Sequence, residues 1–196
     1  MILSAALLAA AFDVVALVDS LDFAQRFDIE KSEGNLQVLE HVLRTSATDV
    51  WWRDKTGGRL RYPSREEAYP LSEDPFDRHT VPREDVFGHL RLDRPEANPF
   101  PILRRECARR GVGFGIHTTW EESHNYIAMT SSWTLNHPQF WCCMNGRKPF
   151  LATCSIAYPE VVAHKLRLVD ERLALGPDTI FLDLARDGGW TALREY

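Results

Sequence analysis

Apolar residues recur at steps of three and four between positions 162 and 173, near the end of the chain. This spacing predicts an amphipathic helix with one apolar face. The members of that face are Val162, Leu166, Val169 and Leu173. Pro159 suits the first helical turn, and Gly176 ends the helix. The apolar run Thr179–Leu182 then predicts a buried strand, and Asp183 follows at its carboxyl end.

The same combination of helix and apolar strand recurs upstream, so the chain is built from repeats of one unit. The predicted strands are Phe12–Val18, Asp49–Trp52, Val112–His117 and Thr179–Leu182. The predicted helices are Asn35–Arg44, Pro99–Arg110 and the segment that begins at Pro159. Strands that are apolar almost throughout are typical of a parallel sheet covered on both faces. The sequence therefore predicts an α/β fold.

Two long connections separate these elements, Arg53–Asn98 and Thr118–Ala157. Both follow the carboxyl ends of strands, whereas the connections that lead from a helix to the next strand are short. This asymmetry is typical of a (β/α)₈ barrel enzyme, whose loops at one face build the site. The main alternative is a doubly wound open sheet, which would want a glycine-rich phosphate loop after the first strand. The segment Asp19–Asp28 contains no glycine.

A barrel wall places sequential strands side by side, in the order 1-2-3-4. The residues at the four strand ends would then lie near one edge of the sheet. These residues are Asp19, Arg53, His117 and Asp183.

The composition narrows the classes of partner. A chain of 196 residues with a net charge of −5 is one domain's worth of sequence. It offers no electrostatic footprint for nucleic acid or for an anionic membrane. The many arginines between Arg53 and Arg110 alternate with acids, which favours a solvated surface. The four cysteines include no C-x-x-C pair, so we expect free thiols and neither a zinc knuckle nor a thioredoxin motif.

Residues 1–11 precede the first predicted strand with almost no polar residue between, and we interpret them as an export signal. The domain would then cover residues 12–196, and the protein would be secreted or periplasmic. The alternative is a run-in to the first strand, which would leave the protein in the cytoplasm.

Three segments resemble the N-terminal half of the bacterial glycosyl-hydrolase-like (β/α)₈ barrel families. They are Gly58–Ser64, the course from Gly115–Asn125 through His137–Trp141 to Tyr158–Lys165, and Thr179–Arg186. The resemblance implies a TIM-type barrel and a glycoside hydrolase that acts on a carbohydrate without a cofactor. Because the sequence holds only the first four units, we expect a partial barrel, from a fragment or a truncated gene product. Its open sheet edges favour self-association.

The resemblance also implies a role for Asp183. In barrel glycosidases that retain configuration, an Asp at the end of this strand is the nucleophile. The alternative is a structural acid that pairs with Arg186. A glycosidase needs a second carboxyl group, and no motif singles one out. The candidates are Asp19, Asp22, Glu121 and Glu122.

Polar and aromatic residues near the strand ends are expected to bind the sugar. They are Asp19, His117, Trp120, Glu121, His124, Asn125, Arg186 and Asp187. The spacing of His117, Glu121 and His124 differs from the H-E-x-x-H pattern, so we expect no metal. Aromatic residues in Thr118–Ala157 favour a carbohydrate site as a cluster, although single loop tryptophans often pin loops. Two alternatives stay open: a non-catalytic carbohydrate-binding barrel, and a metal-assisted hydrolase on the same fold.

Overall fold

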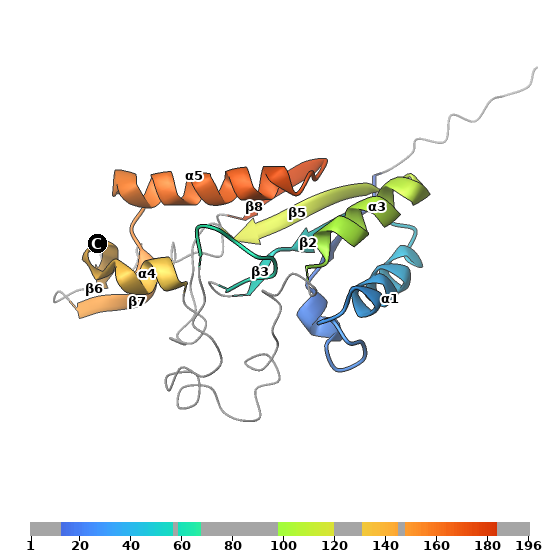
Figure 1. Cartoon of the computed structure of the whole chain (residues 1–196), viewed down its shortest axis with the longest axis horizontal. Coiled ribbons are helices and arrows are strands. Elements are labelled where there is room, and N and C mark those ends of the chain that lie inside the picture. Colours follow the sequence, from blue (N-terminus) through green and yellow to red (C-terminus); the bar gives the residue numbers. More distant parts are fainter. Residues whose placement is uncertain (1–12, 57–58, 68–97, 120–130, 145–147, 184–196) are drawn as a thin grey trace, which may run out of the picture.

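The computed structural model describes residues 13–56, 59–67, 98–119, 131–144 and 148–183 (Figure 1). Its centre is a four-stranded parallel sheet with the strand order β1-β2-β5-β8. The strands are β1 (Val15–Val18), β2 (Asp49–Arg53), β5 (Gly113–Thr119) and β8 (Thr179–Asp183). The predicted α/β class and sequential strand order are confirmed. A doubly wound sheet with the third strand beside the first is excluded.

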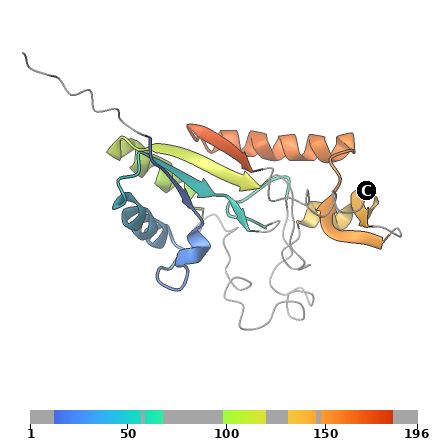
Figure 2. The ribbon, with the colours of Figure 1, turned by 180° about the vertical axis from the view of Figure 1, so that it is seen from behind.

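Three helices cover one face of this sheet (Figures 1 and 2). They are α1 (Ser32–Leu43), α3 (Phe100–Arg110) and α5 (Pro159–Ala174). Gly111 ends α3 in the left-handed conformation, with φ of 68°, which glycine adopts without steric cost. α3 and α5 lie close to their predicted bounds because proline at the start and glycine at the end are strong local signals. α1 has neither signal and begins at Ser32, before its predicted start at Asn35.

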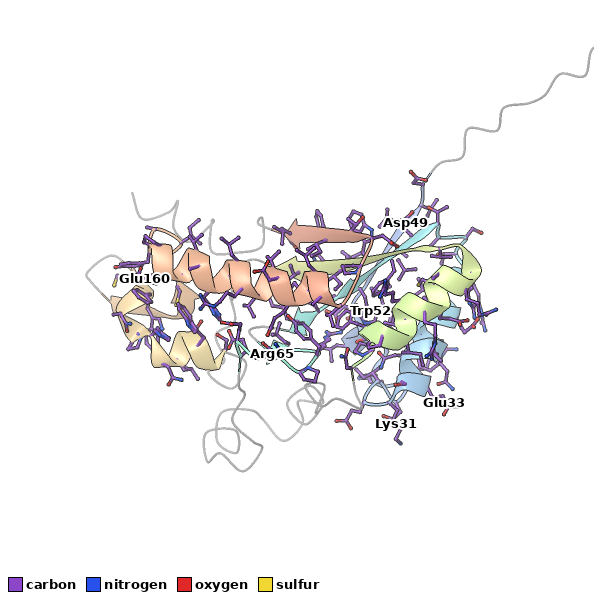
Figure 3. The ribbon with its side chains drawn as sticks, turned by 45° about the horizontal axis from the view of Figure 1, so that its top comes forward. Lys31, Glu33, Asp49, Trp52, Arg65 and Glu160 are labelled. Atoms are coloured by element: carbon purple, nitrogen blue, oxygen red, sulfur yellow. The ribbon has the colours of Figure 1, made fainter. Side chains whose placement is uncertain are left out.

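Successive strand residues point to opposite faces of a sheet, and this alternation defines the core. Val50, Trp52, Phe114 and Ile116 are buried on the face that the helices cover. Trp52 lies between the strands and α3 in Figure 3. The residues that alternate with the core positions along each strand point to the other face. Trp51 on β2 and its register partner Leu17 on β1 are two of them.

The predicted apolar face of α5 is wrong in part, because Leu166 and Leu173 are exposed. The buried side of α5 is instead mixed, and its members are Val161, His164, Lys165, Leu168 and Arg172. Polar groups can be buried at low cost when they are paired. His164 lies 2.9 Å from the Glu67 carboxylate, and Arg172 forms an ion pair with Asp54. The helix therefore packs through ion pairs that periodicity alone does not indicate.

The long connections carry short elements that the sequence did not predict. After β1 comes the 3-10 helix η1 (Ser20–Phe23). The first long connection contains the hairpin of β3 (Lys55–Thr56) and β4 (Arg59–Leu60). The second contains α4 (Ser132–Asn136), η5 (Pro138–Phe140) and the hairpin of β6 (Trp141–Met144) and β7 (Lys148–Cys154). Apart from β7, which has 7 residues, these elements are too short to show a readable hydrophobic period.

All four cysteines lie in the described ranges, and none of them forms a disulfide there. The helices in the described ranges are too short or too polar for any of them to cross a membrane. Residues 1–11, the proposed export signal, lie outside the described residues.

Candidate active site

The carboxyl ends of the four strands bring the predicted residues to one edge of the sheet. Arg53 is in register with His117, and His117 with Phe181 on β8. Asp183 lies opposite Thr119, two residues further toward the carboxyl end of β8. Asp19 follows β1 and contacts Arg53. The arrangement matches the position of active sites in parallel α/β folds.

Asp183 and His117 form the first contact of this site. The Nε2 atom of His117 lies 3.3 Å from Oδ2 of Asp183, and the side chains are 3% and 16% exposed respectively. Burial lowers the pKa of His117, the hydrogen bond to Asp183 opposes this, and the charge on Arg53 lowers the pKa further. The net shift is downward, so the ring is neutral at pH 7. A neutral ring with its proton on Nε2 donates to the Asp183 carboxylate.

The second ring nitrogen of His117 and its ring face have different surroundings. Its Nδ1 atom is buried and has no hydrogen-bond partner among the described residues. The ring stacks on Phe181, with centroids 5.4 Å apart and planes at 25°. The orientation of His117 is therefore set by one hydrogen bond and one stacked ring.

Next to His117, a pair of stacked aromatic rings packs against Gly115. Trp51 stacks on Phe181 with a centroid distance of 5.1 Å. A Cβ atom on residue 115 would lie 2.5 Å from Cδ1 of Trp51, so a larger residue would displace the indole ring. Gly115 is thus required for the close approach of rings from β2 and β8 across β5.

Asp19 has a different environment. Its carboxylate accepts a 2.7 Å hydrogen bond from Nη1 of Arg53, pairs with Arg61, and accepts from the backbone N–H of Leu21 at the start of η1. Burial alone would raise the pKa of Asp19, but Arg61 and then Arg53 outweigh burial and hold the pKa below its usual value. The carboxylate therefore stays ionised at neutral pH, which rules out Asp19 as a proton donor there.

Arg61 was missed by the sequence analysis. The alternation of arginines and acids predicted a solvated surface, yet Arg61 is almost fully buried and contacts both Asp19 and Ser20. The interpretation of the arginines as a uniformly solvated set is therefore wrong at this position. A weak signal was available, since Arg61 lies in the segment Gly58–Ser64 that resembles the barrel families.

The segment Arg61–Glu67 is held against α5. Glu171 accepts hydrogen bonds from Oγ of Ser64 at 2.6 Å, from the backbone N–H of Arg65 at 2.7 Å and from that of Glu66 at 3.3 Å. Arg65 lies beside the helix in Figure 3. These contacts fix the segment that carries Arg61, and so they position the Asp19 cluster.

Trp133 belongs to a second cluster, between α4 and α5. His164 stacks on one face of its ring at 4.2 Å, and His137 stacks at the same centroid distance. An open groove of about 450 Å³ borders this cluster and Arg167. Because Trp133 stacks with two rings, one of them on α5, it pins the connection to α5.

Several predicted site residues lie outside the described residues. They are Trp120, Glu121, His124, Asn125, Arg186 and Asp187. Among the described residues, no group of three His, Cys, Asp or Glu side chains could hold a metal ion. The site residues that the structure describes are Asp19, Arg53, Arg61, His117 and Asp183.

Comparison with known proteins defines the class of fold. No protein-family model and no curated protein matches the sequence. A noncanonic maltogenic alpha-amylase from Thermotoga neapolitana is similar in structure, with a TM-score of 0.53 and 12% identity over 88% of this chain and 39% of that chain. The cyclic alpha-maltosyl-(1-->6)-maltose hydrolase from Arthrobacter globiformis has a TM-score of 0.51 and 12% identity over 89% and 45% of the two chains.

These similarities concern the fold alone. The chain spans less than half the length of either solved structure. It shares with them an α/β fold with a parallel sheet. Within the described residues the sheet is open, with β1 and β8 at its edges.

Proposed function

We propose that this chain is a glycoside hydrolase, or the N-terminal part of one, in which Asp183 is the catalytic carboxylate. The observation that carries the proposal is the pair of Asp183 and a neutral, buried His117 at the carboxyl ends of β8 and β5. Active sites of parallel barrel enzymes occupy this edge. The amylase-type fold of the two similar structures supports a carbohydrate as the substrate.

The geometry suits a carboxylate that must stay in one orientation. A glycosidase uses one carboxylate either to attack the anomeric carbon or to activate a water molecule. The N–H of His117 would hold one oxygen of Asp183. That hydrogen bond would fix the orientation of the carboxylate, which attack on the anomeric carbon or activation of water requires. His117 is therefore a positioning residue for Asp183 in this proposal.

The reaction also needs a proton donor about 5–10 Å from the catalytic carboxylate. Asp19 does not fit, because Arg53 and Arg61 keep it ionised. Glu121 and Glu122 follow β5 in the sequence and stay candidates for this role. We further propose that the sugar contacts come from the predicted set. This set is Asp19, His117, Trp120, Glu121, His124, Asn125, Arg186 and Asp187.

The replacement Asp183→Asn tests the proposal. The names of the two similar proteins make α-linked glucose oligosaccharides and aryl α-glucosides the first substrates to assay. Loss of an essential carboxylate should lower kcat by about 10³-fold or more. The melting temperature should change by only a few degrees, because Asp183 lies at the open end of the strand.

The matched control is Asp178→Asn, which lies before the same strand at its opposite end. Asp178 accepts a 2.9 Å hydrogen bond from the backbone N–H of Phe114, so its role is structural. This variant should lose stability and keep its activity per folded molecule. If the wild type binds saccharides without hydrolysing any, or if Asp183→Asn keeps full activity per folded molecule, the proposal is wrong.

A further inference from the structure

The sheet has one face that the helices do not cover. Figure 2 shows the molecule from this side, with β5 in front of α3 and β8 in front of one end of α5. The side chains on this face include Val15 and Leu17 of β1, Trp51 of β2 and Phe181 of β8. Leu17 is 57% exposed and Phe181 is 40% exposed. Parallel sheets are almost always buried on both faces, so this apolar face calls for a second layer.

Both edge strands are also open. Within the described part of the chain, β1 pairs only with β2, and β8 pairs only with β5. On β8 the residues of both faces are partly exposed, since Leu182 is 37% exposed next to Phe181. An open strand presents unpaired backbone donors and acceptors, which favour pairing with another strand.

The strand order determines which partner fits. All four strands are parallel and follow chain order, so β1 of a second copy placed beside β8 would continue the same order. If the two copies are related by a two-fold axis, β8 of each copy pairs with β1 of the other, so both open edges are paired. Two sheets of four strands make eight, the number at which a parallel barrel closes and its side chains fill the interior.

We propose that two copies of this chain associate through β1, β8 and the uncovered sheet face to form one closed barrel. Val15, Leu17, Trp51 and Phe181 of both copies would fill its interior. The joint between β8 and the neighbouring β1 would bring Asp183 of one copy beside Asp19 of the other. Each strand-end site would then be completed by the arginine-bound Asp19 of the second copy. This inference rests on the sheet and does not depend on the proposed hydrolase activity.

Sedimentation equilibrium of the 196-residue chain tests the proposal. The wild type should have twice the 22.5 kDa mass of one chain at micromolar concentration, with no larger species, because a two-fold barrel is closed. Leu17→Glu places a charge in the interior and should weaken association by at least about 100-fold. Circular dichroism should show that the variant stays folded, since Leu17 is exposed in the single chain.

The matched control is Ile156→Glu. Ile156 is 52% exposed, close to the value for Leu17, but it lies in the connection before α5 and away from β1 and β8. It should not change the mass. A mixture of Leu17→Glu and Phe181→Lys chains should recover a dimer, because the two charges face each other across one of the two joints.

Four outcomes would overturn the proposal. The first is a wild-type monomer at about 100 μM, in which case another segment or protein covers the face. The second is open-ended aggregation, which a closed barrel excludes. The third is equal loss of association in Leu17→Glu and Ile156→Glu. The fourth is failure of the mixed variants to pair while each stays folded.

Discussion

At the scale of single residues, the two acids of the strand ends differ in what surrounds them. Asp19 pairs with Arg53 and Arg61, whereas Asp183 contacts the neutral ring of His117. Fixed positive charges keep an acid ionised and occupy its oxygens. A neutral donor orients the carboxylate without neutralising it. This contrast supports the proposal that Asp183 carries the chemistry while Asp19 supports the site.

Replacement of Asp19 should therefore affect stability strongly. Asp19→Asn removes the negative charge beside the buried Arg61 and should cost about 3 kcal/mol of unfolding free energy. Urea denaturation at pH 7 measures this. The control is Asp28→Asn, which breaks the exposed 2.7 Å pair with Lys31 and should leave stability nearly unchanged. If both substitutions lower the free energy of unfolding equally, the buried pair contributes no more to stability than the exposed one.

At the scale of elements, the buried side of α5 contributes both to the hydrophobic core and to polar contacts with the first long connection. Leu168 joins the hydrophobic core, while Glu171 and Arg172 hold the segment before Glu67 and the Asp54 carboxylate. Sequence patterning found the helix because its proline and glycine signals are local. It assigned part of the apolar face wrongly because the partners of the buried His164 and Arg172 lie 97 and 118 positions away. The ion pair of Arg172 and Asp54 spans 118 positions, which no local period can indicate.

Glu171→Ala should release the Arg61–Glu67 segment without unfolding the helix. The substitution removes the acceptor for the backbone N–H groups of Arg65 and Glu66. Loss of these charge-assisted hydrogen bonds should speed hydrogen exchange at both amides by about tenfold. Nuclear magnetic resonance can follow both amides. Asp170→Ala, on the exposed side of the helix, is the control and should leave the two rates as they are.

At the scale of the whole molecule, the sequence predicts the sheet well and the site in part. Apolar runs that alternate with helices determine the strand order, and the strand order brings Asp19, Arg53, His117 and Asp183 to one edge. The burial of Arg61 and the stacking of Trp51 on Phe181 were not predicted. Both depend on tertiary contacts, namely the return of a connection onto η1 and the small size of Gly115.

The stability of the whole molecule should fall on acidification in two stages. Folding lowers the pKa of His117 from 6.5, so below that pH the unfolded chain takes up a proton that the folded chain does not. Stability should be level above pH 7 and fall as the pH drops below 6.5. Folding also lowers the pKa of Asp19 from 3.8, so a second loss should follow below that pH.

The variant His117→Gln isolates the first stage, because glutamine does not titrate. The free energy of unfolding should be measured by urea denaturation at pH 7.5 and at pH 5 for both proteins. At pH 7.5 the wild type should be the more stable, since glutamine loses the stacking of the imidazole ring on Phe181. At pH 5 this advantage should shrink, because only the wild type must hold a histidine neutral. An advantage that stays constant or grows on acidification would show that His117 is protonated in the folded protein, and the neutral donor to Asp183 would have to be abandoned.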